Sequence, residues 1–473
     1  MDRRDFLKVM GGGTVATAAV LSGCKQAPTA SAEGFAQGEV PTDKMTYRTG
    51  HHGEKVSLLG YGCMRMPTLE GDSGRENNQE LDQEQINRLT DYAIEHGVNL
   101  FDTAPPYCKG RSEHAMGIAL SRHPRDKYYL SSKMSNFPPN TWSREASINI
   151  YRNTFKELKI DYIDFMMLHA IGGTSKDLSG RELSPMEVFE ARFINNGILD
   201  FLMEEREKGR IRNLGFSYHG DVKVFDRAVD MDDTVHWNHV LIQHNYVDWH
   251  HEAVEQGGDA DSEYMYNRLA EKDIPIFVME PLLGGTLAKL NDAATAQLKQ
   301  HDPQASIASW AFRFAGSQPR ILTVLSGMTY MEHLQDNIRT YSPLKPLTED
   351  EYSMLEGIAH QLSNFPTVPC TGCQYCMPCS YGIDIPGVFA HYNKCVNEGN
   401  VALADDADAD KKAYRHSRRA FLVGYDRSVP RLRQADHCIG CGACVHKCPQ
   451  KIDIPAQMKR IDGYVEKLKV SGT

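Results

Sequence analysis

The chain has 473 residues, of which 41% are hydrophobic and 24% are charged. This composition is typical of a folded globular protein and excludes disorder over most of the chain, and the length allows one large domain and a smaller one. Because 52 Lys and Arg stand against 62 Asp and Glu, the formal net charge is −10, which argues against nucleic acid as a partner. Twelve cysteines are too few for a disulfide scaffold of this length, yet eight of them fall into two closely spaced runs between Cys370 and Cys448.

The first 24 residues resemble an export signal. Arg3 and Arg4 precede an apolar run from Val9 to Leu21 that is too short to span a bilayer as a helix. The run ends in Leu-Ser-Gly-Cys, which resembles a lipoprotein processing box with Cys24 as the lipidated residue. We therefore expect twin-arginine export and a lipid anchor at the periplasmic or extracytoplasmic face of the membrane. The alternative is an ordinary cleaved signal in which the cysteine is incidental.

Residues 25–45 are rich in Ala, Gly, Thr and Pro and predict a flexible linker. From 46 to 345, short apolar runs alternate with helical patterns, and the strand candidates are 56–60, 98–102, 128–132, 162–168, 211–216, 240–243, 275–279 and 321–325. Eight such units predict an α/β fold, a closed (β/α)₈ barrel. No Gly-x-Gly-x-x-Gly follows an early strand, which disfavours a doubly wound dinucleotide-binding sheet.

Four polar residues stand at or just after the ends of three predicted strands, where barrel chemistry is located. They are Asp102, Tyr107, Lys133 and His169. Lys133, paired with Asp102, is expected to hold positive charge beside the Tyr107 hydroxyl and to lower its pKa toward working pH. Tyr107 would then protonate a carbonyl oxygen that His169 orients. Each residue alone has an ordinary structural explanation, but their coincidence at one barrel mouth favours a catalytic site.

At these residues the sequence resembles the aldo-keto reductase superfamily, whose Asp, Tyr, Lys and His tetrad they match in type, order and approximate spacing. The resemblance implies hydride transfer between a nicotinamide cofactor and a small carbonyl or alcohol substrate, with the tyrosine as proton donor. It also extends to Gly-Phe-Ser at 215–217 and to Gln-His-Asn-Tyr at 243–246. These positions imply that Ser217 and Gln243 contact the nicotinamide.

The same resemblance leaves the choice between NADP and NAD open. Met279 stands where many members of the family have a stacking aromatic residue. The residues that follow the eighth strand, Ser-Gly-Met at 326–328, lack the basic residue that commonly holds a 2′-phosphate. Asn337 matches the asparagine on the adenine side of the family's cofactor site, and the amides at the N-terminus of its helix could still hold a phosphate.

The C-terminal part begins after a predicted connecting helix at 346–368 and spans 369–460, with a tail at 461–473. Its cysteines form C-x2-C-x2-C-x2-C from Cys370 and C-x2-C-x2-C-x3-C-P from Cys438, and Ile-Asp-Ile-Pro follows each run. The shared ending indicates an internal duplication, and the second motif resembles bacterial-type ferredoxins. The resemblance implies a small, mainly helical domain with two [4Fe–4S] clusters, or one at minimum. Two structural zinc sites and disulfides are the alternatives.

In two-cluster ferredoxins, the fourth cysteine of each run ligates the other cluster. The resemblance therefore implies one cluster on Cys370, Cys373, Cys376 and Cys448, and a second on Cys438, Cys441, Cys444 and Cys379. The remaining thiols, Cys63, Cys108 and Cys395, are expected to be structural. Histidines within 236–239 and 249–251 lack a metal-ligand spacing and are expected in loops.

Together these features predict an exported, membrane-tethered oxidoreductase of the aldo-keto reductase type, whose clusters exchange electrons with a redox partner protein. Two alternatives remain. In one, the barrel is a docking scaffold for an electron-transfer subunit. In the other, the clusters rather than a soluble nicotinamide deliver the electrons for carbonyl reduction. The segment 170–196, which would shape the substrate site, matches nothing diagnostic, so the substrate itself is not predicted.

Overall fold

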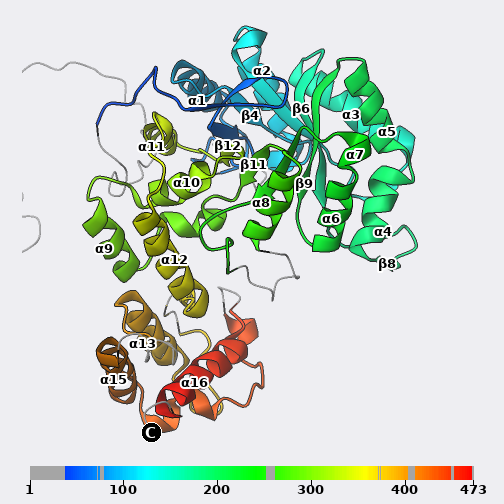
Figure 1. Cartoon of the computed structure of the whole chain (residues 1–473). Coiled ribbons are helices and arrows are strands. Elements are labelled where there is room, and N and C mark those ends of the chain that lie inside the picture. Colours follow the sequence, from blue (N-terminus) through cyan, green and yellow to red (C-terminus); the bar gives the residue numbers. More distant parts are fainter. Residues whose placement is uncertain are drawn as a thin grey trace, which may run out of the picture. The chain divides into compact units, whose positions relative to one another are not determined.

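The computed structural model describes residues 38–71, 73–74, 79–251, 261–370, 372, 374–402, 411–448 and 452–470. The predicted export signal with Cys24, most of the 25–45 linker and Cys373 lie outside the described residues. The described chain comprises an α/β barrel and a helical module that contains the C-terminal cysteines (Figure 1). None of the helices within these ranges has the length and hydropathy needed to cross a membrane.

Eight parallel strands close into a barrel in the order β10-β11-β12-β3-β4-β5-β6-β9. Their bounds are Leu59–Gly62 for β3, Leu100–Asp102 for β4, Tyr129–Met134 for β5, Ile163–Ile171 for β6, Ile211–Tyr218 for β9, His239–Gln243 for β10, Ile276–Met279 for β11 and Ile321–Ser326 for β12. Each coincides with a predicted strand to within three residues at either end. The prediction of a (β/α)₈ barrel is therefore confirmed.

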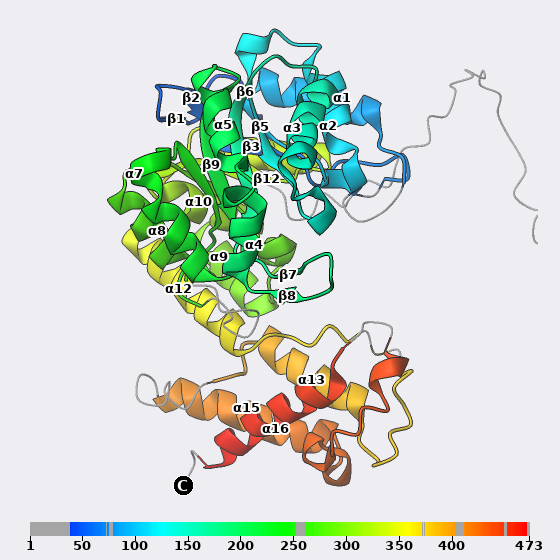
Figure 2. The same ribbon diagram turned by 90° about the vertical axis from the view of Figure 1, so that its right-hand side faces the viewer.

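Helices surround the strands (Figures 1 and 2). They are α1 (Gln83–Glu95), α2 (Ser112–Leu120), α3 (Arg144–Leu158), α4 (Pro185–Phe189), α5 (Ile198–Glu207), α6 (Val222–Asp230), α7 (Asp232–Val235), α8 (Ser262–Glu271), α9 (Asp292–His301), α10 (Ile307–Ser317), α11 (Met331–Tyr341) and α12 (Glu349–Asn364). Helix α1 shows how a local sequence signal starts a helix. Asp82 caps its N-terminus by accepting a hydrogen bond from the Gln85 amide at 2.9 Å. Ile86, Leu89 and Ala93 then bury one face of the helix.

The first predicted strand, 56–60, has the wrong start. Val56 and Ser57 belong instead to β2 (Lys55–Ser57), which pairs antiparallel with β1 (Tyr47–Thr49) ahead of the barrel. The Ser57 hydroxyl donates to the Leu59 carbonyl at 2.7 Å across the bend between the two elements. The barrel strand β3 therefore begins only at Leu59. A continuous apolar run in the sequence does not reveal such a change of direction.

Inward-facing side chains of the barrel strands fill the interior of the barrel, together with Val56 of β2. This inner cluster comprises Val56, Leu100, Phe165, Met167, Leu241, Phe277, Leu322 and Leu325. His239, which was expected in a loop, begins β10, is fully buried, and its ring centroid lies 5.1 Å from that of Phe165 and 4.8 Å from that of Phe277. Burial lowers the pKa of His239 to about 3, so its ring is neutral. The expectation failed because a histidine beside an apolar run looks like the polar boundary of a strand.

The C-terminal module has a hydrophobic core of its own. Its helices are α13 (Ile385–Asn397), α15 (Lys411–Ser428) and α16 (Ile454–Val470) (Figure 2). Each Ile-Asp-Ile-Pro repeat starts a helix, because Asp384 accepts a hydrogen bond from the Gly387 amide at 3.1 Å and Asp453 accepts one from the Ala456 amide at 3.2 Å. Residues 461–470, expected as part of a tail, continue α16, because Ile461, Val465 and Leu468 are buried at helical spacing.

The close packing of β9 against β10 can be tested at Gly215, which lies in β9. A Cβ atom at this position would lie 2.1 Å from the His239 carbonyl oxygen and 2.8 Å from the His239 ring. We expect Gly215→Ala to lower the free energy of unfolding by about 3 kcal/mol, since neither neighbour can move away freely. Chemical denaturation followed by circular dichroism measures the change.

The matched control is Gly357→Ala in α12, where an added Cβ meets no atom within 4 Å. This change should stabilise the protein slightly, by about 0.5–1 kcal/mol, because alanine favours the helix. Equal stability of the two variants would contradict the close approach of β9 to β10.

Candidate active site

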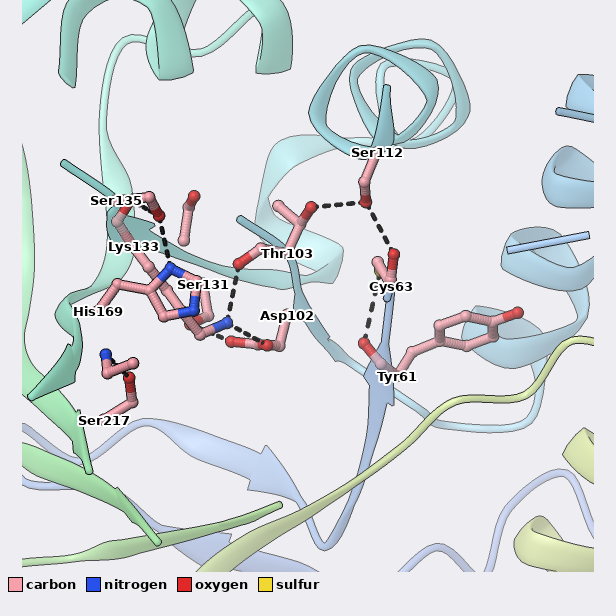
Figure 3. A network of polar contacts seen from close by, with 12 residues as sticks. Tyr61, Cys63, Asp102, Thr103, Ser112, Ser131, Lys133, Ser135, His169 and Ser217 are labelled. Carbon is pink, nitrogen blue, oxygen red and sulfur yellow. Dashed lines mark hydrogen bonds and ion pairs between the residues drawn. The ribbon is translucent and has the colours of Figure 1, made fainter. Parts of the chain in front are cut away.

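The predicted catalytic residues meet at the C-terminal mouth of the barrel. Asp102 ends β4 and lies beside Ser131 of β5, while Lys133 lies beside Met167 of β6. Since side chains alternate along a strand, Asp102, Lys133 and His169 all point inward (Figure 3). Tyr107 follows β4 in a 3₁₀ turn (Tyr107–Gly110), and its ring lies edge-on to that of His169, with 5.8 Å between the centroids. The sequence alone therefore located all four side chains.

The centre of this site is a buried ion pair. Lys133 Nζ lies 2.5 Å from Asp102 Oδ1 and donates to the Thr103 carbonyl at 2.9 Å, and both charged side chains are under 5% exposed. Ser131 donates to the second oxygen of Asp102 at 2.8 Å. Burial acts to lower the pKa of Lys133, but Asp102 and Tyr107 outweigh it and raise that pKa, so the ammonium group stays charged.

Tyr107 responds to this charge in a way that the sequence did not predict. Its ring lies 4.7 Å from Lys133 Nζ, and the Lys133 ammonium group acts to lower the pKa of the hydroxyl. Burial acts more strongly in the opposite direction, and the net pKa of Tyr107 is raised. The expectation of a pKa lowered toward working pH is therefore wrong, because the sequence gives no measure of burial. The hydroxyl keeps its proton and can donate it.

His169 is held neutral beside Tyr107. Burial first, and then the positive charges of Lys133 and Arg192, keep the pKa of His169 well below its usual value. Its Nδ1 atom lies 2.5 Å from the Ser135 hydroxyl, and its ring centroid lies 4.8 Å from that of Phe137. Ser135 was not predicted, although it continues the inward period of Ser131 and Lys133 by two residues. A neutral imidazole with one nitrogen engaged can use the other toward a substrate oxygen.

The backbone around His169 is held in an unusual conformation. The pairing of β6 with β9 shifts between Leu168 and Ile171, and Ala170 adopts φ +49°, a left-handed value that is costly for a residue with a Cβ. The Ser217 hydroxyl accepts a hydrogen bond from the Ala170 amide at 2.7 Å and lies 3.4 Å from the Leu168 carbonyl (Figure 3). Ser217 therefore stabilises the bulge that carries His169.

Arg192 also stabilises this bulge. Its guanidinium donates to the carbonyls of His169 at 2.8 Å and Ala170 at 3.2 Å, and it lies 4.6 Å from the ring centroid of Phe137 and 4.5 Å from that of Phe193. The side chain is 4% exposed, and burial lowers its pKa. Arg192 belongs to a π-helix (Glu190–Ile194) that follows the short β7–β8 hairpin (Ser175–Lys176 with Glu182–Leu183) and α4. No periodic pattern in 170–196 could have identified it.

Besides Ser217, the residues expected near a nicotinamide nucleotide lie at or close to the ends of three neighbouring strands, β10, β11 and β12. Gln243 ends β10 and is half-buried, and Met279 ends β11. The Asn337 amide on α11 donates to the Ser326 hydroxyl at 3.0 Å, at the end of β12. Arg65, in the loop after β3, lies close to the residues that follow β12. The side chain of Arg65 lies against Gly327, because a Cβ there would stand 3.2 Å from it.

Cys63 and Cys108, which lie near the tetrad, are buried, as expected of structural thiols. Burial raises the pKa of both thiols, which keeps them protonated and unreactive. The Ser112 hydroxyl donates to the Cys63 carbonyl at 2.8 Å and accepts a hydrogen bond from the Thr103 hydroxyl at 2.7 Å. This chain of contacts fixes Thr103, whose carbonyl accepts from Lys133 (Figure 3). Cys395 is buried in the core of the C-terminal module.

The cysteines of the two motifs meet at the edge of that core. Those packed against it are Cys370, Cys376, Cys379, Cys438, Cys444 and Cys448. The thiols that raise the pKa of Cys444 after burial are Cys438, Cys441 and Cys379, so the fourth cysteine of the first motif lies with three cysteines of the second. Within the described ranges, no three Cys, His, Asp or Glu side chains are close enough together to hold a single metal ion. Four thiolates of this kind are the donor set that a [4Fe–4S] cluster takes.

Comparison with known proteins covers both parts of the chain. Residues 58–360 match the model of the aldo/keto reductase family, and residues 369–452 match that of the 4Fe-4S dicluster domain. The cysteine module is therefore a [4Fe–4S] domain at the C-terminus, as the motifs predicted. The first match covers more than half of the chain and includes all four residues of the barrel mouth.

Proteins of known name are similar to part of this chain. The uncharacterized oxidoreductase YqkF of Bacillus subtilis is 24% identical over 323 residues, which are 65% of this chain and 94% of that protein. L-galactose dehydrogenase of Arabidopsis thaliana is 22% identical over 325 residues, 65% of this chain and 91% of that protein. The solved structure of a thermostable aldo-keto reductase, Tm1743 with the inhibitor epalrestat, has a TM-score of 0.50 and 20% identity, and covers 66% of this chain and 100% of that one. This last likeness shows the fold.

Removing one partner of the buried ion pair should destabilise the barrel. In Lys133→Met the Asp102 carboxylate would be left buried without a counter-charge, and we expect a loss of about 3–5 kcal/mol in the free energy of unfolding. The control is Arg88→Met, which breaks the exposed pair with Glu84 and should cost less than about 1 kcal/mol. Equal losses in the two variants, measured by denaturant unfolding, would show that the buried pair does not constrain the mouth.

Proposed function

The chain belongs to the aldo/keto reductase family, and from this premise we propose that its barrel transfers hydride between a nicotinamide nucleotide and a small carbonyl or alcohol substrate. The observation that carries the proposal is the geometry at the mouth: Lys133 Nζ lies 2.5 Å from Asp102 Oδ1 and 4.7 Å from the centroid of the Tyr107 ring, which lies 5.8 Å from that of His169. We further propose that the [4Fe–4S] domain exchanges single electrons with a redox partner protein.

In the direction of reduction, Tyr107 gives its proton to the carbonyl oxygen. The phenolate left behind is stabilised by the Lys133 ammonium group, whose charge is in turn fixed by Asp102. His169 donates a hydrogen bond to the same oxygen through the ring nitrogen that Ser135 does not engage, and so orients the carbonyl. A bound nicotinamide would supply the hydride to the carbonyl carbon. In the direction of oxidation, the phenolate accepts the alcohol proton.

NADP is the cofactor that the charges at the mouth favour. The aliphatic part of the Arg65 side chain lies against Gly327, just after β12. Its guanidinium group would bind a phosphate at the N-terminus of α11, where anions are favoured. Asn337 lies six residues, about 1.7 turns, beyond Met331 at the start of that helix, and it would contact the adenine side of the nucleotide. Gln243 would contact the nicotinamide. The Ser217 hydroxyl would also contact the nicotinamide only if it kept one hydrogen bond to the β6 bulge and made a second one to the cofactor.

We infer the crossed arrangement of ligands, which the presence of Cys379 near Cys444 supports. One cluster would be held by Cys438, Cys441, Cys444 and Cys379. The other would be held by Cys370, Cys373, Cys376 and Cys448, of which Cys373 lies outside the described residues.

We also propose that the protein is exported by the twin-arginine route and anchored through a lipid on Cys24. This route carries folded proteins, so clusters assembled in the reducing cytoplasm would survive export. Mass spectrometry of the N-terminal peptide from the membrane fraction tests the anchor, because a lipidated Cys24 would begin the mature chain and Cys24→Ser would release the protein. An unmodified Cys24 in wild type would contradict it.

Tyr107→Phe removes the proton donor and leaves the ring in place. We expect kcat for carbonyl reduction to fall by about 10²–10⁴-fold, since that is the contribution of a positioned general acid, while NADPH binding changes little. Tyr128→Phe, which removes a hydroxyl just before β5 at the opposite end of the strand, is the matched control and should keep full activity. Undiminished reduction of a panel of aldehydes and ketones by Tyr107→Phe would refute the hydride-transfer proposal.

The holoprotein, purified without oxygen, should contain close to eight iron atoms and eight acid-labile sulfides, as two [4Fe–4S] clusters require. Cys379→Ala should remove the cluster whose other ligands lie in the second motif and so halve the iron content. Cys395→Ala, a thiol in the module core with no proposed iron, should retain both clusters. Stoichiometric zinc without sulfide, or an unchanged iron content in Cys379→Ala, would contradict the crossed arrangement.

A further inference from the structure

The two halves of the cysteine module differ in charge although they repeat one motif. Residues 427–448 contain four Lys or Arg and one Asp, a formal charge of +3. The equally long segment 363–384 contains no Lys or Arg and one Asp, a formal charge of −1. Each segment carries four cysteines, so holding iron does not require the difference. The chain as a whole is acidic, with a net charge of −10, which makes this local excess of cations more unusual.

The cations of the second half lie at the surface around the cysteine loop. Three 3₁₀ turns, Arg431–Arg433, Ala435–His437 and Val445–Lys447, flank Cys441 in the sequence, and Cys441 is exposed. We call the exposed basic side chains of this segment the basic edge, and they are Arg427, Arg431, Arg433, His437, His446 and Lys447. Two large apolar side chains stand among them, Leu432 at 79% and Ile439 at 62% exposure.

Contacts within the module fix this segment but leave most of its charge unused. Arg433 Nε donates to the Gly382 carbonyl at 3.1 Å, and the Asp384 amide donates to the Arg433 carbonyl at 2.9 Å, so the basic edge is fastened to the first half. Within the described part of the chain, the side chains of Arg427, Arg431 and Lys447 form no hydrogen bond or ion pair. Their charges are therefore available to an external partner.

We propose that the basic edge docks an acidic one-electron carrier protein. The proposal rests on the proposed electron-transfer function of the [4Fe–4S] domain and names its partner and surface. Complementary charge accelerates the encounter, and Leu432 and Ile439 provide a small apolar contact of the size that transient redox complexes use. A [4Fe–4S] cluster held by Cys438, Cys441, Cys444 and Cys379 would take up one electron from the carrier, which would be oxidised by the loss of that electron, with no bond made or broken. The reverse transfer uses the same surface.

An anionic membrane is the other surface that cations attract. Membrane-surface binding by this kind of segment typically uses an amphipathic helix with a continuous apolar face. The basic edge consists of short turns with two separated apolar side chains, which fits a protein partner better.

The test uses the full-length holoprotein and a reduced acidic flavodoxin as the probe. Stopped-flow absorbance gives the second-order rate constant for electron transfer to the clusters at ionic strengths from about 0.01 M to about 0.15 M, over which the Debye length falls from about 30 Å to about 8 Å. The test variant is Arg427→Gln/Arg431→Gln/Lys447→Gln. Its control, Lys394→Gln/Lys459→Gln/Lys467→Gln, removes the same charge from exposed positions on α13 and α16.

We expect the wild-type rate constant to fall at least tenfold as salt rises, and the test variant to be about tenfold slower at low salt with little salt dependence. The control variant should stay within about twofold of wild type. Equal losses in the two variants would overturn the proposal. So would a shifted cluster potential in the test variant, measured by a redox titration followed by electron paramagnetic resonance, because the cations would then tune the cluster.

Two further outcomes would also contradict the proposal, and they distinguish failure of the docking surface from failure of the electron-transfer function. Binding of the holoprotein to phosphatidylserine vesicles through these cations, without electron transfer from flavodoxin, would assign the basic edge to the membrane. Absence of clusters that dithionite can reduce would overturn the electron-transfer function itself, and the docking proposal with it.

Discussion

The ion pair between Lys133 and Asp102 is the interaction on which the rest of the barrel mouth depends. A lysine ammonium group inside a barrel loses its hydration, and it remains charged only because a carboxylate and a backbone carbonyl replace the water. The fixed charge then acts on its neighbours. It opposes the effect of burial on the Tyr107 hydroxyl and helps to keep the His169 imidazole neutral. One buried cation thus leaves one proton donor and one neutral hydrogen-bonding group side by side.

Residues that are not expected to contact the substrate hold these groups in position. Ser135 engages one nitrogen of His169, while Ser217 and Arg192 hold the bulge in β6 on which His169 sits. The cost of a left-handed Ala170 is offset by these hydrogen bonds. Positioning within a few tenths of an ångström is what a proton transfer requires, and this network shows how the barrel achieves it.

The sequence predicted the eight strands and the tetrad because both depend on local patterns: apolar runs at strand length, and polar residues where those runs stop. Ser135 was within reach, since it continues the inward period of Lys133. Arg192 was not, because a π-helix in an irregular segment leaves no periodic signal. The net direction of the Tyr107 pKa and the buried position of His239 both depend on tertiary packing, which no local pattern encodes. In the C-terminal module, the repeated Ile-Asp-Ile-Pro predicted the duplication but not the difference in surface charge between its halves.

The barrel and the cluster domain together raise the question of which one reduces the substrate. Our account assigns that step to hydride from the nicotinamide, delivered beside Tyr107. The most direct test is to reduce a panel of aldehydes and ketones with NADPH deuterated at the transferable position of C4, without oxygen, and to analyse the alcohols by mass spectrometry. We expect one deuterium on the former carbonyl carbon, and no product when dithionite-reduced clusters are the sole reductant. Alcohol without deuterium, or formed with the clusters alone, would contradict it.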